Sequence, residues 1–538
     1  MRDFELMELC LKKNQISENE WNKTIEEAIG NENFFVRYSA VIGIEKYGNH
    51  QHLPFILNLL SEEDRKPLYS QPEGLKNAHA HAGDNKVSDI EFKNETTDEE
   101  KDAWQRRGKL KQASLLAIGG LFKREYNIHY DIALIRLLHQ YALSQKEDYS
   151  VRAAACKTLG YIKNKESLEV LKAASEDMEW CTKTEALKSI DRLNNINSSE
   201  VDNSADFYYN NEINRAPFYI GNLNELRNKI LKTDIETIKR IWLGIKNRSG
   251  NGNFPWFEPF CAIITEDKEQ IKAACDSIRS YAASLKNLRY NPGVHLHSWC
   301  YSFPHARFAL YLQWLYAVGA FSFQEAKELM SDMVSHQFMY YFSCYKVKPE
   351  PETVDNQTLS LALSNSLIGY IFGNAPFNSE IARLMFEKSI KRVAHILKEM
   401  GKAGYSGEGS TYMYHVISSC IPLGVELLEH IDQKDYFTQC ENAAKMMLYQ
   451  IMPGGLALPW DHYGYILPTL QLLSYNSKRT NQEKYSKIVE KYLDYSYSAG
   501  TGWGYDDLVW TLIWYTQGKA EKTKVFEPWF VENVAGCL

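Results

Sequence analysis

The sequence lacks the usual marks of disulfide-rich, zinc-binding and membrane proteins. Its ten cysteines are scattered over 538 residues without any Cys-x-x-Cys pair, which excludes the common spacings of a disulfide framework or a structural zinc site. No uncharged run reaches the length of a membrane span, and the first residues contain no continuous apolar segment like that of a signal peptide. We therefore expect a soluble protein without a metal site or a membrane contact. Whether it works in the cytoplasm or, after loss of a leader, in the periplasm or outside the cell stays open.

An excess of positive charge is also absent. The chain carries 61 Lys and Arg against 68 Asp and Glu, a formal net charge of −7, and phosphate backbones demand a basic surface. We therefore do not expect nucleic acid as a partner. Aromatic side chains, by contrast, are abundant, with 34 Tyr and 12 Trp. Flat rings of this kind stack on sugars, so the composition favours a carbohydrate ligand, and an acidic polymer would need a locally cationic cleft.

An internal repeat is visible in the first 200 residues. Residues 35–44 align with residues 150–159, residues 112–119 form a third copy, and residues 184–190 start a fourth. Small residues where helices approach, a Val-Arg pair at the helix start and a paired second helix together resemble HEAT repeats. The resemblance implies a helical repeat domain and a possible protein partner. We place that domain at 1–195.

The polar segment 61–107 interrupts this domain and predicts a solvated insertion. Residues 193–212 are rich in Asn and Ser and predict a linker. From 213 to 538 the sequence changes to long amphipathic segments separated by short Gly and Pro turns, so we expect an all-α fold. Antiparallel helix pairs continued over this length favour an incomplete α/α toroid over a linear helical solenoid. The predicted helices are 305–319, 324–342, 358–372, 380–400, 411–429, 436–450, 464–475 and 483–497.

A chemically dense segment, residues 404–415, leads into one of these helices. It combines glycines with Glu408, Tyr412, Tyr414 and His415. Glycine lets the backbone approach a ligand closely, and a helix start favours an anion such as the carboxylate of a sugar acid. If the helix begins early, Glu408, Tyr412 and His415 share one face at i, i+4 and i+7. The segment predicts a catalytic loop, although an ordinary loop with half-buried tyrosines has the same composition.

Two segments of the second domain resemble polysaccharide lyases of the heparinase II/III and alginate lyase type. The first, residues 354–363, looks like the Asn-containing segment that opens a helix in that family, and its asparagine is Asn356. The second, residues 408–415, is similar to the family's Glu-Gly-x-x-Tyr and Tyr-His patterns. The resemblance implies cleavage of a uronic acid polymer by β-elimination, with Asn356 neutralising the uronate carboxylate and Tyr412 acting as base, acid or both. This scheme requires no cofactor.

One departure from the family concerns the base. Several members place a histidine directly after the catalytic asparagine, where this chain has Gln357. The proton would then go to Tyr412 itself or to a histidine from elsewhere, for which His297, His305 and His462 are candidates. Arg307 could pair with a substrate carboxylate. The residues expected to contact the substrate are Gln357, Arg307, Trp299, Glu408, Tyr414, His415, Trp460 and Asp461.

Two other functions fit the same sequence. An inverting glycoside hydrolase on an α/α barrel uses two carboxylates, which Glu408 with Asp461 or Asp507 could supply. A scaffold that binds carbohydrate or protein without catalysis would need no convergence of Asn356 and Tyr412. A lyase requires donors and a cation around the substrate acid, whereas a hydrolase requires two facing carboxylates.

Overall fold

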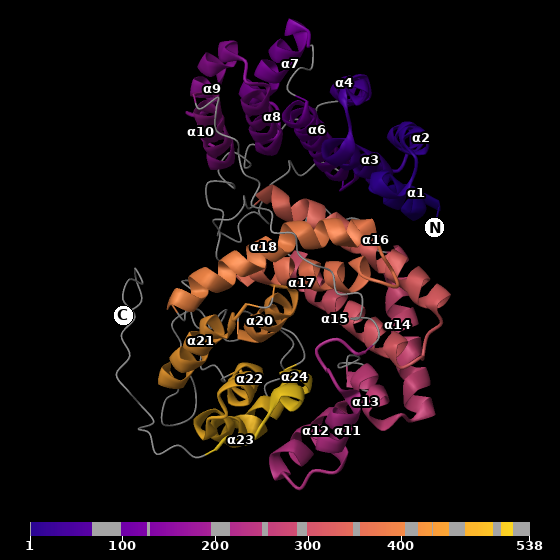
Figure 1. The fold of residues 1–538 in the computed structure, drawn as a ribbon, viewed down its shortest axis with the longest axis vertical. Helices are drawn as coiled ribbons and strands as arrows, with labels where there is room; N and C mark the ends of the chain where they lie inside the picture. The colour runs from indigo at the N-terminus through magenta and orange to yellow at the C-terminus, as the bar shows by residue number, and fades with distance from the viewer. Residues whose placement is uncertain are drawn as a thin grey trace. The chain divides into compact units, whose positions relative to one another are not determined.

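We describe the fold from a computed structural model, and the account covers the residues that it places well. These are residues 2–66, 98–125, 130–194, 216–249, 257–287, 298–347, 356–403, 418–432, 434–450, 469–498 and 507–519. They form helices joined by turns, and their extended pairing is limited to one bridge between Gln482 and Lys519. The prediction of an all-α fold is therefore confirmed (Figure 1). No helix in these ranges is long and apolar enough to cross a lipid bilayer.

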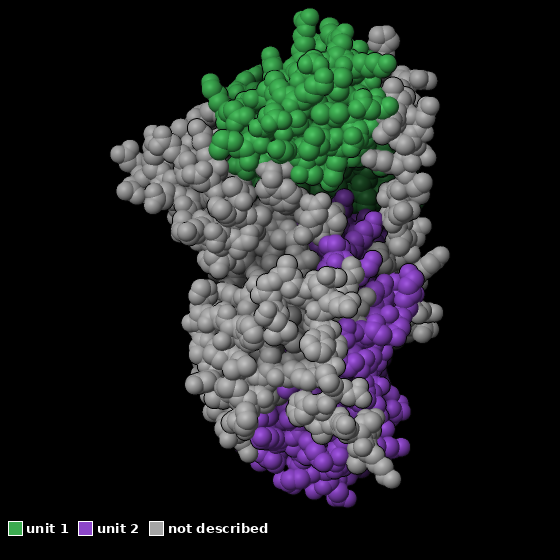
Figure 2. All heavy atoms as spheres, turned by 90° about the vertical axis from the view of Figure 1, so that its left-hand side faces the viewer, with its two compact units in different colours: residues 1–205, 289–297, 342–349 green, residues 206–288, 298–341, 350–538 purple. Residues whose placement is uncertain are grey.

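The chain divides into two compact units (Figure 2). Unit 1 comprises residues 1–205 with 289–297 and 342–349, and unit 2 comprises the remainder. The division after residue 205 falls within the segment 193–212, whose composition predicts a linker. Each unit has its own apolar core, with the fully buried Trp21 in unit 1 and the fully buried Trp314 in unit 2.

Unit 1 is built on a row of helices that carry the sequence repeat. The four copies lie on α3, α6, α8 and α10, and each of these helices contacts the next in that order. The intervening helices α4, α7 and α9 pack against the row. The helices of unit 1 are α1 (Arg2–Cys10), α2 (Glu18–Ile29), α3 (Phe34–Tyr47), α4 (Leu53–Arg65), α6 (Asp98–Arg124), α7 (Ile132–Leu143), α8 (Tyr149–Ile162), α9 (Leu168–Ala174) and α10 (Trp180–Asn194).

The polar insertion expected at 61–107 is helical at both of its ends. Residues 61–65 complete α4 and residues 98–107 begin α6, whereas 67–97 lie outside the described residues. Glu63 is 2% exposed and Arg107 is 7% exposed. Nε of Arg107 donates to the carbonyl of Glu63 over 2.8 Å, and Arg37 lies 3.4 Å from the Glu63 carboxylate. Glu63 is paired with Arg37, and Arg107 lies 3.8 Å from both Asp64 and Glu147. Because both charges have partners, residues that the sequence assigns to a solvated segment are buried instead.

Unit 2, like unit 1, is built from helices. Its elements are α11 (Leu223–Leu231), α12 (Glu236–Arg248), α13 (Phe257–Thr265), α14 (Lys268–Asn287), α15 (Ser298–Ala317), α16 (Phe323–Val347), α17 (Asn356–Gly373), α18 (Glu380–Ala403), α20 (Ser418–Asp432), α21 (Phe437–Gln450), α22 (Leu470–Thr480), α23 (Glu483–Ser498) and α24 (Asp507–Trp514). We call α13, α15, α17, α20, α22 and α24 the inner helices, and α14, α16, α18, α21 and α23 the outer helices.

The contacts among the inner helices follow a circular order. Each inner helix contacts the next, from α13 through α15, α17, α20 and α22 to α24. The circle is completed by α12, which contacts both α24 and α13. Lys229 on α11 adds to this closure, because its Nζ donates to the carbonyls of Leu512 and Ile513 at the end of α24 over 3.0 and 2.9 Å. The first and last helices of unit 2 are thereby held together.

Candidate functional site

The inner helices of unit 2 share one direction. Short connections leave them, namely residues 318–322 after α15, 374–379 after α17 and 481–482 after α22, and such short turns make consecutive helices antiparallel. Accordingly Gly369, near the end of α17, lies against Phe386 in the first half of α18. Gly424, in the middle of α20, lies against Leu363 in the middle of α17, and the rings of Tyr370 and His430, near the ends of these two helices, have their centres 5.8 Å apart. Helices α17 and α20 therefore run the same way, and the alternation extends this to α15 and α22.

The first residues of the inner helices consequently lie at one end of unit 2, which we call its N-terminal end. The connections that lead into these helices are longer than those that leave them and lie outside the described residues. They are residues 288–297 before α15, 348–355 before α17, 404–417 before α20, 451–468 before α22 and 499–506 before α24.

The sequence-predicted site residues divide between this end and the undescribed connections. Asn356 is the first residue of α17 and Gln357 the second, and Trp299 lies in the first turn of α15. These helices contact each other. Arg307 and His305 lie further along α15. The remaining residues lie outside the described residues, in the connections before α15, α20 and α22: His297, Glu408, Tyr412, Tyr414, His415, Trp460, Asp461 and His462.

Arg307, expected to pair with a substrate carboxylate, is largely buried within α15. It lies in the middle of α15, and only 9% of it is exposed. Nine residues separate it from Ser298, the first residue of α15, which corresponds to roughly 13 Å along a helix axis. Arg307 is therefore part of the packed wall of the inner helices, with its backbone well below the N-terminal end.

His305, one of the histidines considered as a base, is fully buried in the same helix. Its Nε2 lies 3.0 Å from Nδ1 of His336 on α16, and Nε2 of Gln337 donates to Oδ1 of Asn365 on α17. Burial lowers the pKa of His305 well below its ordinary value, with a further lowering by His336 and an opposing effect of Gln337. Burial alone lowers the pKa of His336 to about 4. Both rings are therefore neutral at physiological pH. They link α15 to α16, and the bond from Gln337 to Asn365 links α16 to α17.

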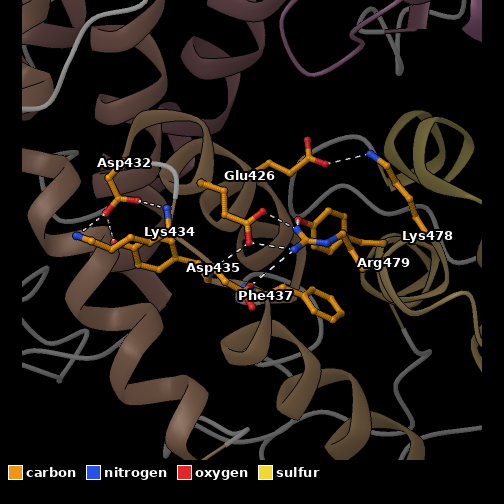
Figure 3. A network of polar contacts seen from close by, with 10 residues as sticks. Glu426, Asp432, Lys434, Asp435, Phe437, Lys478 and Arg479 are labelled. Carbon is orange, nitrogen blue, oxygen red and sulfur yellow. Dashed lines mark hydrogen bonds and ion pairs between the residues drawn. The ribbon is translucent and has the colours of Figure 1, made fainter.

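A second polar network braces α20, α21 and α22 at the opposite end of unit 2 (Figure 3). Nη1 and Nη2 of Arg479 donate to the Glu429 carboxylate over 2.6 and 3.1 Å, and Nη1 also donates to the Tyr475 hydroxyl over 2.8 Å. The guanidinium lies 4.6 Å from the ring centre of Phe437. Although burial opposes the charge, the hydrogen bonds to Glu429 and Tyr475 raise the pKa of Arg479. Beside it Lys478 pairs with Glu426 at 3.2 Å, a carboxyl whose pKa burial raises.

This brace and the buried histidine pair were not predicted from the sequence. Their members are spread over separate helices, and Lys478 and Arg479 lie beyond the predicted helix 464–475, in the last turn of the observed α22. Neither group contains the ligands for a cation, and the described ranges contain no cluster of His, Cys, Asp or Glu that could hold a metal ion. A scan against protein-family models and a search of curated proteins found no match to this sequence.

Proposed function

We propose that this protein is a polysaccharide lyase that cleaves a uronic-acid-containing polysaccharide by β-elimination. The observation that carries the proposal is the start of α17 at Asn356. The resemblance to heparinase-type lyases requires an asparagine that opens an inner helix. The second motif, residues 408–415, directly precedes α20, and α20 contacts α17. Both motifs thus lead into neighbouring helices that run in the same direction.

The arrangement of unit 2 supports an α/α toroid as the framework of this site. The inner helices contact one another in circular order, and α12 joins the last to the first. The row formed by α3, α6, α8 and α10 likewise supports HEAT-like repeats in unit 1, since these helices carry the four repeat copies in order. A toroid presents the ends of its inner helices to a ligand, and Trp299, Asn356 and Gln357 lie in the first turns of α15 and α17, which supports a site at that end.

The proposed reaction divides its tasks between two side chains. Asn356 donates a hydrogen bond to the uronate carboxylate, which makes the neighbouring carbon-bound proton more acidic. Tyr412 removes that proton and returns a proton to the leaving glycosidic oxygen as the double bond forms. A free phenol titrates near ~10, so a cation or the start of α20 must favour the phenolate of Tyr412. Gln357 cannot accept the proton, which leaves Tyr412 or His462 and His297 for this step.

The test measures the ultraviolet absorbance of the unsaturated uronate product on a panel of acidic polysaccharides. Wild type should produce absorbance on at least one polymer. Tyr412→Phe and Asn356→Ala should each lower that rate by about 10²-fold or more. Tyr414→Phe should retain most of it, and Asn58→Ala, an exposed asparagine of unit 1, serves as the control. New reducing ends without absorbance would instead assign a hydrolase that uses Glu408 and Asp461, and neither product on any polymer would favour a binding scaffold.

A further inference from the structure

Residues 216–222, which we call the strap, enter unit 2 immediately before α11. The side-chain amide of Gln313 on α15 bonds to the strap backbone twice: it accepts from the amide of Phe218 and donates to the carbonyl of Ala216, both over 2.8 Å. Nε1 of Trp314, the next residue of α15, donates to the carbonyl of Phe218 over 2.8 Å. Three hydrogen bonds therefore fix the strap to the last turns of α15.

The strap also contacts the inner helices on the other side of the circle. The Phe218 ring, which is 7% exposed, lies 5.6 Å from the ring of Tyr370 on α17 and 5.7 Å from that of His430 on α20. The Tyr219 hydroxyl donates to the carbonyl of Leu423 on α20 over 2.8 Å. Its ring meets Trp510 on α24 edge to face at 5.5 Å. Two consecutive strap residues thus contact α15, α17, α20 and α24.

The backbone at this point is held in an unfavourable conformation. Tyr219 has a φ of 66°, in the left-handed region that non-glycine residues with bulky side chains seldom adopt. Such a conformation persists where the surrounding contacts determine it. Here this backbone conformation orients the Tyr219 side chain so that its hydroxyl can bond to α20 and its ring can contact α24.

We propose that the strap is a latch that couples α15, α20 and α24 into one cooperatively opening group. Around the circle each inner helix contacts its neighbours, whereas the strap connects non-neighbouring helices directly. If the strap dissociates from these helices, α24 loses its connection through the strap to α20 and α15. The contact between the first and last helices of unit 2 then weakens. The strap follows the segment that joins unit 1 to unit 2 in the sequence.

Hydrogen exchange of the full chain, followed by peptide, tests this proposal without reference to the enzymatic activity. Phe218→Ala should accelerate exchange by about tenfold or more in α15, α20 and α24 together. Tyr219→Phe keeps the ring contact with Trp510 and removes only the hydroxyl bond. Because the three helices open as one group, it should accelerate exchange a few-fold in α15, α20 and α24 alike.

Phe323→Ala, at a 43% exposed phenylalanine of α16, is the matched control and should leave all three helices unchanged. Acceleration confined to residues 216–222 and α15 in Phe218→Ala would overturn the coupling. If Phe218→Ala does not fold, Tyr219→Phe decides alone, and unchanged exchange in both α20 and α24 would then refute the latch.

Discussion

Arg152 on α8 and Asp177 after α9 form a two-point ion pair, in which Nε and Nη2 of the arginine donate to the carboxylate over 2.8 and 3.0 Å. The two side chains are only 3% and 4% exposed. We expect Arg152→Ala to destabilise unit 1 by about 3–5 kcal/mol, because it leaves the Asp177 carboxylate buried without its cation. Calorimetric melting of the full chain should show one transition shifted strongly downward, which also identifies the transition of unit 1.

The control for this prediction is an exposed pair on the neighbouring helix. Lys172 lies 2.8 Å from Glu169, with side-chain exposures of 56% and 80%. Lys172→Ala should change stability by less than about 0.5 kcal/mol, since exposed pairs contribute little. Equal effects of the two alanine variants would contradict the distinction between buried and exposed pairs.

The sequence repeat predicts one half of this interaction. Its alignment identifies Arg37 and Arg152 as equivalent residues at the start of a repeat. It did not identify their partners, because Glu63 and Asp177 lie 26 and 25 residues further on, in the polar sequence at the end of the second helix. An acid at this nearly constant separation was the available signal. Composition alone instead assigned Glu63 to a solvated insertion, because it takes no account of pairing.

Glu179 gives unit 1 a specific pH dependence. It is 6% exposed, and burial raises its pKa from 4.5 to about 7. The positive charge of Arg152 opposes this shift, whereas the negative charges of Asp177 and Asp148 add to it. The unfolded chain therefore releases this proton at lower pH than the folded chain, so the contribution of Glu179 to stability is largest below pH 4.5 and is lost as the pH rises to 7. At about 1.4 kcal/mol per pKa unit the loss is roughly 3 kcal/mol.

Glu179→Gln removes this titration. The variant should melt at a higher temperature than wild type above pH 7 and at nearly the same temperature below pH 4.5, as measured by calorimetry of the unit 1 transition. Glu169→Gln, at a carboxylate that is 80% exposed, should give parallel curves for variant and wild type. If Glu179→Gln raised the melting temperature equally at every pH, the prediction would be wrong, because burial of the Glu179 charge would then carry no free-energy cost.

Gly369 marks a close approach of α17 to α18. A Cβ at this position would lie 2.5 Å from the carbonyl oxygen of Ala382 and 2.7 Å from the amide of Phe386, both backbone atoms that cannot move aside alone. Gly369→Ala should therefore destabilise unit 2 by about 1–3 kcal/mol through overpacking. Gly30→Ala is the matched control, because its nearest atoms lie at 3.7 Å. Calorimetry should show a lowered unit 2 transition for the first variant and no comparable loss for the second.

Helix positions in unit 2 were predictable from periodicity to different extents. The helix predicted at 436–450 agrees to within one residue with α21 (Phe437–Gln450). The helix predicted at 483–497 agrees equally well with α23 (Glu483–Ser498). The prediction of 305–319 was wrong at its start, because α15 begins at Ser298 and continues through Pro304. Proline removes one backbone donor, and the packing of α15 against α13, α14 and α17 outweighs that loss. Periodicity also gives no geometry for the connections that carry the proposed catalytic residues, since these have no regular pattern.

The pair formed by His305 and His336 should make unit 2 sensitive to acid. Burial lowers the pKa of His336 from 6.5 to about 4, and burial together with the neighbouring His336 lowers the pKa of His305 well below its ordinary value. Between these values the unfolded chain takes up protons that the folded chain excludes, so stability falls as the pH drops from 6.5 to 4. The loss from His336 alone is roughly 3 kcal/mol at about 1.4 kcal/mol per pKa unit.

His336→Asn tests this origin, because an asparagine amide occupies the place of Nδ1 and can still bond to His305 without titrating near neutral pH. The variant should lower the unit 2 transition at neutral pH through its smaller volume, yet lose less further stability than wild type as the pH falls to 4. His50→Asn, at a histidine of unit 1 whose side chain is 61% exposed, should leave this acid sensitivity as in wild type. If His336→Asn and wild type lose stability in parallel across the window, the acid sensitivity of unit 2 arises elsewhere and the pair serves packing alone.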